Sequence, residues 1–359
     1  MTADDSNLQE WRLSWQCGPT TSCTGRQRMI TSHRQKSLVP YAIFGRCSLF
    51  AMVVIASANA QDFPTKLVKM VVPFTAGSVQ DLRARHIGAL LGPRLGQPII
   101  VDNRPGANGV IGTAVVAKAK PDGYTLLLCT GSVLGGNAAL IPNLSYDPVK
   151  DFAPVVRLVT TSGIVAVSAA SQVRSLQQLI AAAKSNPGGQ RYGSGSSYAH
   201  ILGELLARRA GVELLYVPYK GDSQALTDLL GGHIDLMFST PILLLPHIKA
   251  GRIRALSVAG SHRLSALPDV PTLEEGGLHN AELLAWAGIC APAGTPATIV
   301  GKINREALAA MMSPDVKAEV EAQGYQVSTN TADEFAAFIK ADILRVAKLV
   351  KELGIPPEQ

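Results

Sequence analysis

Serine, histidine and aspartate residues lie near one another in the chain after position 190, and side chains of these types could form a nucleophilic catalytic site. Ser194 is followed by His200 and, further along, by Asp222. An α/β hydrolase carries its serine in a G-x-S-x-G turn, and its acid precedes its histidine in the chain. Gly193-Ser194-Gly195 lacks that frame, and the order of the residues differs. A secreted serine hydrolase on an α/β scaffold therefore stays only as an alternative.

Motifs for metals and nucleotides are absent from the sequence. No CxxC, HxxxH or HExxH spacing occurs, so we predict no metal site. Gly106-Ala107-Asn108-Gly109 does not fit G-x-G-x-x-G, and no Gly-Lys-Ser/Thr follows it as in a P-loop. We therefore predict no catalytic residue and no cofactor, whereas a binding protein needs only the features that are present.

The loop from Phe74 to Asp81 could bind an anion where a predicted strand gives way to a helix. Ser78 can cap that helix, with Asp81 three residues later, and Gly77 lets the backbone approach a ligand closely. Hydrogen bonds from exposed N–H groups to a charged ligand contribute about 1.5–3 kcal/mol each, and the helix dipole adds to them. These features suit a carboxylate, although an ordinary capped helix after a turn is the alternative interpretation.

Two further loops follow predicted strands and are also candidates for ligand contact. Their candidate residues are Thr130, Ser132, Ser194, Gly195, Ser196 and His200. Turn and capping roles are the alternative for the serines, and a helix-cap or core role is the alternative for the histidine. Lys220, in a fourth loop, could pair with a carboxylate, although an exposed lysine on a solvated rim is the favoured interpretation. Trp286 could lie near a ligand, and packing between the domains explains it equally well.

Apolar strands of four to seven residues alternate with helical stripes from Leu67 onwards, which predicts an α/β fold. The predicted strands are 68–72, 99–101, 125–129, 190–193, 213–217, 234–238, 253–259 and 286–291. Leu82 and Ile87 begin the apolar face of the first helix, and Ser313 and Thr331 cap two later ones.

Two stretches of the sequence are predicted to cross between domains. The apolar run 155–167 enters a second domain, and 286–291 returns to the first. We predict domain 1 from 61–161 plus 284–359 and domain 2 from 162–283, each a mainly parallel sheet flanked by helices. A ligand cleft would lie between them, because ligands of open α/β sheets bind outside the carboxyl ends of the strands.

Several motifs occur together in the order typical of one family. They are VDNRPGANGVIGTAVVAKAKPDGYTLLL at 101–128, PFTAGSVQD at 73–81, YDPVKDFAPV at 146–155, and VPYKG followed by ALTDLLGGHIDLMF. With these motifs the chain resembles the Bug-type substrate-binding proteins of tripartite tricarboxylate transporters over roughly 63–354.

The resemblance implies a two-domain periplasmic-binding-protein fold that closes on a small carboxylate. In such proteins the loop that corresponds to 74–81 binds one carboxylate of the ligand, chiefly through main-chain N–H groups and ordered water. The loop that corresponds to Ser194, Gly195 and Ser196 faces it across the cleft. The implied first-loop residues are Ala76, Gly77, Ser78 and Asp81, and Phe74 of the same loop is a further candidate for ligand contact. The loop departs from the family, which typically has a second proline and a Gly-Gly pair where this chain has Thr75-Ala76 and Gly77-Ser78. A receptor that delivers its ligand to the permease subunits of a tripartite transporter, or instead serves a sensor kinase, follows from this resemblance, and we expect it to be a monomer.

Residues 1–60 are predicted to be a leader with a signal peptide. Cys47–Ala58 forms an apolar core of about a dozen residues, shorter than the roughly 20 needed to span a bilayer. Ala58-Asn59-Ala60 fits a cleavage site, which places the mature N-terminus near Gln61 in the periplasm. Met29 would give a conventional leader if it were the true start.

Charge and cysteine content limit which kinds of protein this chain could be. The leader carries six of the 33 Lys and Arg residues and three of the 27 Asp and Glu residues, which leaves a mature balance of only +3. That balance, without a basic run, argues against nucleic-acid binding. Cys129 and Cys290 lie in apolar runs, so we expect buried free thiols, although one disulfide between them is conceivable.

Overall fold

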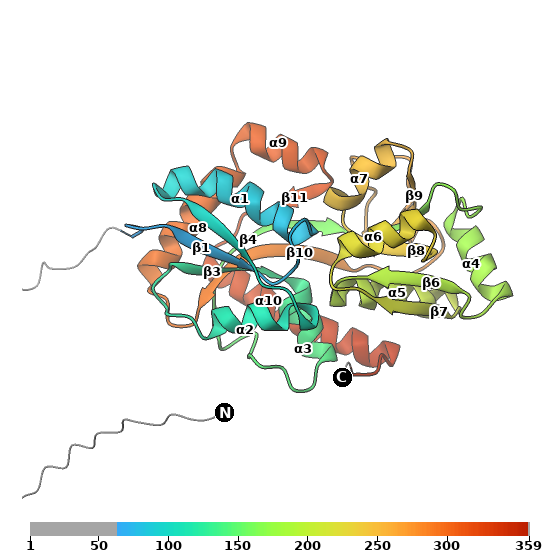
Figure 1. The fold of residues 1–359 in the computed structure, drawn as a ribbon, viewed down its shortest axis with the longest axis horizontal. Coiled ribbons are helices and arrows are strands. Elements are labelled where there is room, and N and C mark those ends of the chain that lie inside the picture. Colours follow the sequence, from blue (N-terminus) through green and yellow to red (C-terminus); the bar gives the residue numbers. More distant parts are fainter. Residues whose placement is uncertain (1–62, 358–359) are drawn as a thin grey trace, which may run out of the picture. The chain divides into compact units, whose positions relative to one another are not determined.

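Two β-sheets organise the computed structural model, which describes residues 63–357 (Figure 1). The first sheet has the order β11 (Tyr325–Val327), β4 (Phe152–Ser162), β10 (Leu284–Pro292), β3 (Thr125–Thr130), β1 (Val68–Val72) and β2 (Ile99–Asn103). The second has the order β7 (Leu214–Pro218), β6 (Gln190–Ser194), β8 (Leu236–Ser239), β5 (Ile164–Ser168) and β9 (Ile253–Val258). We call the first sheet with its helices lobe 1 and the second sheet with its helices lobe 2.

Helices flank both sheets. In lobe 1 they are α1 (Val79–Leu95), α2 (Val110–Ala117), α3 (Asn137–Leu140), α8 (Ala297–Met311), α9 (Pro314–Ala322) and α10 (Ala332–Leu353). In lobe 2 they are α4 (Leu176–Ser185), α5 (Ser197–Ala210), α6 (Asp222–Gly231) and α7 (Pro241–Lys249). The predicted α/β class is thereby confirmed.

Most strands of each sheet point the same way, as predicted, but each sheet also contains at least one strand that runs against the others. β10 runs antiparallel to both β3 and β4, and β5 runs antiparallel to both β8 and β9. These are the strands by which the chain enters a lobe after crossing, so each inserts against the direction of its neighbours. β4 ends at Ser162 and β10 begins at Leu284, next to the predicted limits of domain 2 at 162–283, which stay a prediction.

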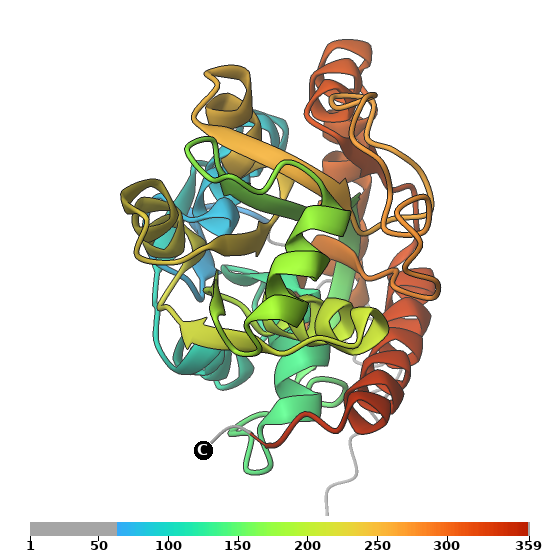
Figure 2. The ribbon, with the colours of Figure 1, turned by 90° about the vertical axis from the view of Figure 1, so that its right-hand side faces the viewer.

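The two faces of β5 illustrate how the lobe 2 sheet is covered. Val165 and Val167 pack into one hydrophobic cluster with α5, and Ile164 and Ala166 pack into another with α6 and α7, as the two-residue period of a strand requires. Val346, on the C-terminal half of α10, joins the first of these clusters, and Figure 2 shows this helix running beside lobe 2. Helix α10 therefore begins in lobe 1 and packs against both lobes.

Helix ends follow the sequence signals closely. Thr331 and Glu334 form the reciprocal capping box that the sequence predicts at the start of α10. Ser313 differs from its prediction as a cap, because its hydroxyl donates to the Ala310 carbonyl instead of accepting an N–H of α9. Proline at the first position nevertheless starts α9 where expected.

Cys129 and Cys290 form a disulfide, so the expectation of free thiols is wrong. The antiparallel register places Cys129 opposite Gly288 and Cys290 opposite Leu127, which makes the two cysteines diagonal neighbours. Their Cα atoms lie 5.9 Å apart, within the usual range for a disulfide. The bond joins β3 to β10 inside the lobe 1 core, where both side chains are fully buried.

The predicted signal peptide, the cleavage after Ala60 and the proposed start at Met29 lie outside the described residues. Across 63–357 we find no helix with the length and apolar character needed to cross a membrane.

Candidate ligand-binding site

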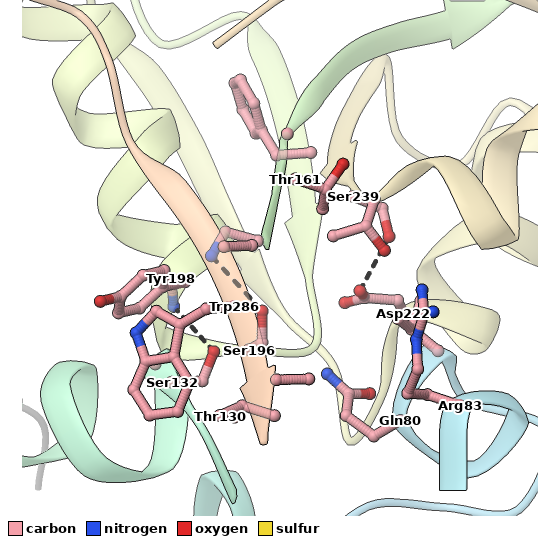
Figure 3. Close-up of a pocket in the computed structure, with 18 of the residues that line it drawn as sticks. Gln80, Arg83, Thr130, Ser132, Thr161, Ser196, Tyr198, Asp222, Ser239 and Trp286 are labelled. Carbon is pink, nitrogen blue, oxygen red and sulfur yellow. Dashed lines mark hydrogen bonds between the residues drawn. The ribbon is translucent and has the colours of Figure 1, made fainter. Parts of the chain in front are cut away.

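A cavity lies where the two lobes meet, and it contains about 750 Å³ of empty space including its opening to solvent. Side chains from α1, β3 and β10 of lobe 1 and from α5, α6 and β8 of lobe 2 contribute to its wall (Figure 3). Its polar lining residues are Gln80, Arg83, Thr130, Ser132, Thr161, Ser196, Asp222, Ser239 and Thr240. Most of the remaining wall is apolar or aromatic, which is typical of small-molecule sites.

The first turn of α1 forms one part of the wall. Ser78 caps the helix by accepting the Asp81 N–H at 3.2 Å, and the next residues, Val79 and Gln80, line the cavity. The positive end of the helix dipole is therefore directed at the cavity. The Gly77 N–H, however, donates to the Asp81 carboxylate at 2.8 Å within the loop itself.

The Asp81 side chain stabilises the loop and does not line the cavity in this conformation. Its carboxylate is buried, and the Arg85 Nε donates to it at 3.0 Å. Burial alone would raise the pKa of the Asp81 carboxyl, but the hydrogen bonds from Arg85 and from the Gly77 N–H together lower it below its ordinary value. The charge of Asp81 is thus held inside the loop by Arg85, which weakens its repulsion of an anion in the cavity.

Hydroxyl groups at the ends of β3 and β6 form a second polar part of the cavity wall. The Ser132 Oγ accepts the Tyr198 N–H from lobe 2 at 3.4 Å, so it bridges the two lobes. Ser196 caps α5 by accepting the Ala199 N–H at 3.4 Å. Thr130 completes this group on the lobe 1 side. The N-terminus of a 14-residue helix, α5, therefore points at the cavity from lobe 2.

An aromatic part of the cavity wall, formed by Trp286 and Tyr198, is fixed by one buried carboxylate. Asp342, on α10, accepts the Trp286 Nε1–H at 2.8 Å and also accepts the Tyr198 hydroxyl. Arg345 donates to the same carboxylate at 2.7 Å. Burial, reinforced by the Asp342 charge, raises the pKa of Tyr198 well above its ordinary value, so its hydroxyl stays a donor at all physiological pH values.

Among the described residues that line the cavity, Asp222 is the one with an acidic side chain. One of its carboxylate oxygens accepts the Gly195 N–H at 2.9 Å, and the other accepts the Ser239 hydroxyl at 2.9 Å. Burial raises the pKa of Asp222 above its ordinary value, and the two hydrogen bonds offset only part of that effect. The folded protein therefore binds a proton here at pH values where the unfolded chain has released it.

This pKa shift predicts how Asp222→Asn changes stability with pH. The contribution of Asp222 to wild-type stability falls as pH rises from the ordinary pKa of 3.8 through the raised folded value, because ionising a buried carboxyl costs free energy. Asparagine does not ionise, so the free energy of unfolding of the variant relative to wild type should increase across that window and then level off. Urea denaturation at a series of pH values measures it. Asp315→Asn, an exposed residue in the first turn of α9, is the matched control, and a pH-independent difference for Asp222→Asn would contradict the prediction.

The structure brings three of the sequence-predicted site residues together on the cavity wall: Thr130, Ser132 and Ser196. Gly77 and Ala76 are exposed on the loop beside it, and the Gly77 carbonyl accepts the Ser223 hydroxyl of lobe 2 at 2.8 Å. Ser78 acts through its cap. These loops thus meet across the lobes, and direct contact of Ala76, Gly77, Ser78 and Asp81 with a ligand stays a prediction.

Besides the first-loop residues Ala76, Gly77, Ser78 and Asp81, four more predicted residues lie outside the cavity lining. Phe74 packs in the lobe 1 core, and the Ser194 hydroxyl donates to the Ser196 carbonyl at 2.7 Å. Gly195 uses its N–H on Asp222, as described above. The His200 ring stacks on Tyr216 with centroids 3.9 Å apart. Packing and capping therefore account for these positions in this conformation.

Arg83 and Tyr325 line the cavity and escaped the sequence-based prediction. Arg83 stands four residues after Val79 and four before Ile87, on the buried stripe of α1, and that spacing is the signal that could have identified it. Tyr325 lies on β11, a strand of three residues that is too short to show a period. Trp286, which the sequence left between cleft and packing roles, does both.

Comparison with known proteins supplies the family. Residues 83–355 match the tripartite tricarboxylate transporter family receptor, TctC. The chain belongs to this family. It is 36% identical to Protein BugT of Bordetella pertussis over 304 residues, which cover 84% of this chain and 93% of BugT. The resemblance to Bug-type proteins is therefore confirmed.

Solved structures agree with the fold. The periplasmic binding protein BugD superimposes with a TM-score of 0.79 at 32% identity, over 82% of this chain and all (100%) of BugD. R. palustris Rpa4515, solved with adipate, gives a TM-score of 0.80 at 33% identity, over 82% of this chain and 100% of that one. These relatives are substrate-binding proteins, so the chain is a solute receptor and not an enzyme.

Proposed function

We propose that this receptor binds a small carboxylate in the cavity between its lobes and delivers it to a tripartite tricarboxylate-type membrane transporter. The observation that carries the proposal is the convergence of two helix N-termini, those of α1 and α5, on one largely apolar cavity lined by both lobes. Helix N-termini favour anions through their free N–H groups and their dipoles. Rpa4515 holds adipate in a related fold, which supports the same ligand class here.

The finer parts of this proposal concern location and partners. Export through the leader at 1–60 would place the mature chain in the periplasm, and the description of its family names a tripartite transporter. We propose the membrane permease subunits as its partners and a monomer as its free state. Uptake of a radiolabelled carboxylate in cells that lack the receptor gene, with and without restoration of the gene, tests delivery. A sensor kinase as the partner predicts unchanged uptake but a lost transcriptional response.

A thermal-shift screen of organic acids tests the ligand class. A ligand at one hundred times its dissociation constant stabilises the folded state by about 2.7 kcal/mol, so a true ligand should raise the melting temperature measurably. We expect carboxylates to do so and their neutral amides to have no effect. Adipate with adipamide is a suitable first pair, because the two molecules share a carbon chain and differ in charge.

Two results would count against the proposal. One is stabilisation by the amides equal to that by the acids, which would mean that the cavity does not select an anion. The other is turnover of generic esters that is lost in Ser194→Ala, which would revive the hydrolase alternative. We expect no turnover, because the Ser194 hydroxyl already donates to a main-chain carbonyl and the His200 ring is stacked on Tyr216.

A further inference from the structure

Arg83 is a buried cation on the cavity wall. The residue is only 2% exposed, and neither Nη1 nor Nη2 has a hydrogen-bond partner among the residues that the structure describes. Burying an ionised group without a partner costs much free energy, so charged groups inside proteins are normally paired. Arg83 also belongs to no ion pair within 63–357. An unpaired guanidinium on a ligand cavity points to an anion that arrives with the ligand.

Its surroundings hold the guanidinium but leave the N–H edge unused. The plane of Arg83 stacks on the Tyr325 ring, with the guanidinium carbon 3.8 Å from the ring centroid. The Tyr325 hydroxyl is in turn within 3.0 Å of the Thr240 hydroxyl, which fixes the ring. A guanidinium held by its face can still form two parallel hydrogen bonds to a carboxylate through its edge. Both nitrogens are shielded from water in this conformation, so the wall must adjust slightly when a ligand anion enters.

Asp222 does not neutralise Arg83. Both oxygens of its carboxylate already accept hydrogen bonds from lobe 2, and no ion pair joins the two residues in this structure. Figure 3 shows Arg83, Gln80, Asp222 and Ser239 toward one side of the cavity, while Thr130, Ser132, Tyr198 and Trp286 lie toward the other. The cavity thus has a cationic end and a hydroxyl-rich end.

Apolar side chains form much of the remaining cavity wall. They include Leu128, Val159, Leu202, Phe238 and Leu283. A ligand with hydroxyl groups along its body would leave those groups without hydrogen-bond partners against this wall, which costs free energy. A hydrocarbon chain would bury itself there favourably.

We propose that Arg83 is the residue that selects a ligand with two carboxylates joined by an apolar chain, one carboxylate pairing with its guanidinium and the other lying against Thr130, Ser132 and Ser196. This inference rests on the proposed function and adds the class of ligand to it. A monocarboxylate of the same length would leave the Arg83 charge buried and unpaired, and would therefore bind more weakly.

Isothermal titration calorimetry with matched acids tests this selection. The probes are the α,ω-dicarboxylates from succinate to suberate, each paired with the unbranched monocarboxylate of the same carbon number. In the wild type we expect the best dicarboxylate to bind at least tenfold more tightly than its partner. Arg83→Gln should weaken that dicarboxylate by about 10- to 100-fold, the range for losing hydrogen bonds to a charged group, and should change the monocarboxylate less than threefold. Arg83→Lys keeps the charge but not the planar fork, so its affinity for the dicarboxylate should lie between those of the wild type and Arg83→Gln.

Controls separate selection from folding. Arg94→Gln removes the same charge from the far end of α1, where Arg94 pairs with Glu306 on the surface, and it should leave both affinities unchanged. Arg83→Met preserves the apolar stem and should melt no lower than wild type without ligand, because it removes an unpaired buried charge. Equal losses for both members of a pair in Arg83→Gln and Arg83→Met would overturn the inference while leaving the proposed function intact. If no carboxylate binds the wild type, the proposed function fails and the inference fails with it.

Discussion

Replacing Cys129 and Cys290 by alanine should lower the free energy of unfolding by about 2–5 kcal/mol. The disulfide joins residues 161 positions apart, so it removes much conformational freedom from the unfolded chain, and longer loops give the larger values in that range. Both sulfur atoms are also buried in the lobe 1 core, which adds a small packing loss. Urea denaturation of the oxidised wild type and the variant measures the difference.

The single variants provide the control for this prediction. If the bond exists, Cys129→Ala and Cys290→Ala should each lose nearly as much stability as the double variant, because either one breaks the same link. Reduced wild type keeps both sulfur atoms and should match the variants apart from packing. Two alkylated thiols in the unreduced, denatured protein, together with additive single effects, would show that the cysteines are free.

Sequence patterns anticipated the local parts of the fold and missed its non-local parts. Strand β1 spans Val68–Val72 as predicted, because an apolar run bounded by turns is a local signal. The directions of β5 and β10, and the proximity of Cys129 to Cys290, depend on which strands become neighbours across long stretches of sequence, 161 positions for the two cysteines. No period in the sequence encodes that choice, so the reversed directions of β5 and β10 were not predicted and the thiols were predicted as free.

The candidate site likewise contains residues that local sequence signals identify and others that they miss. Thr130, Ser132 and Ser196 were identified because residues after strands in an α/β fold gather at one edge of the sheet. Arg83 was missed because the sequence assigned Leu82 to the apolar face of α1, whereas Leu82 is 40% exposed and Arg83 is buried. Arginine is rarely buried, so an apolar neighbour is the natural choice for the core face. The exception at Arg83 lies at the cavity, where a buried cation can have a function.

Gly131→Leu should weaken carboxylate binding by roughly 100-fold without unfolding the protein. Gly131 lies between Thr130 and Ser132 on the cavity wall and has an ordinary helical backbone, so a side chain is compatible with its conformation. A Cβ atom there would lie 2.5 Å from the Tyr198 Cζ of lobe 2, far inside van der Waals contact. Tyr198 cannot move aside cheaply, because its hydroxyl is bound to Asp342. The lobes would have to separate at this point.

The expected size follows from the cost of that separation. Overpacking a tight contact costs about 1–3 kcal/mol for added methylene groups, and a whole leucine side chain exceeds the lower part of that range. Because each 1.4 kcal/mol is tenfold in affinity, a closed state made about 3 kcal/mol less favourable binds roughly 100-fold more weakly. Gly131→Ala should show a smaller loss, of about tenfold. Calorimetry with the best carboxylate from the screen measures both variants, and circular dichroism verifies their fold.

Gly301 supplies the matched control for the clash at Gly131. It lies on the exposed face of α8, and an added Cβ would meet no atom within 4 Å. Gly301→Leu should therefore raise stability by up to about 1 kcal/mol through helix propensity and leave ligand affinity unchanged. Tyr198→Ala in the Gly131→Leu background should recover part of the lost affinity, because it removes the atoms that the new side chain meets. Wild-type affinity in Gly131→Leu would mean that the lobes need not approach at Gly131 when the ligand binds, and the cavity between them would then not be the binding site.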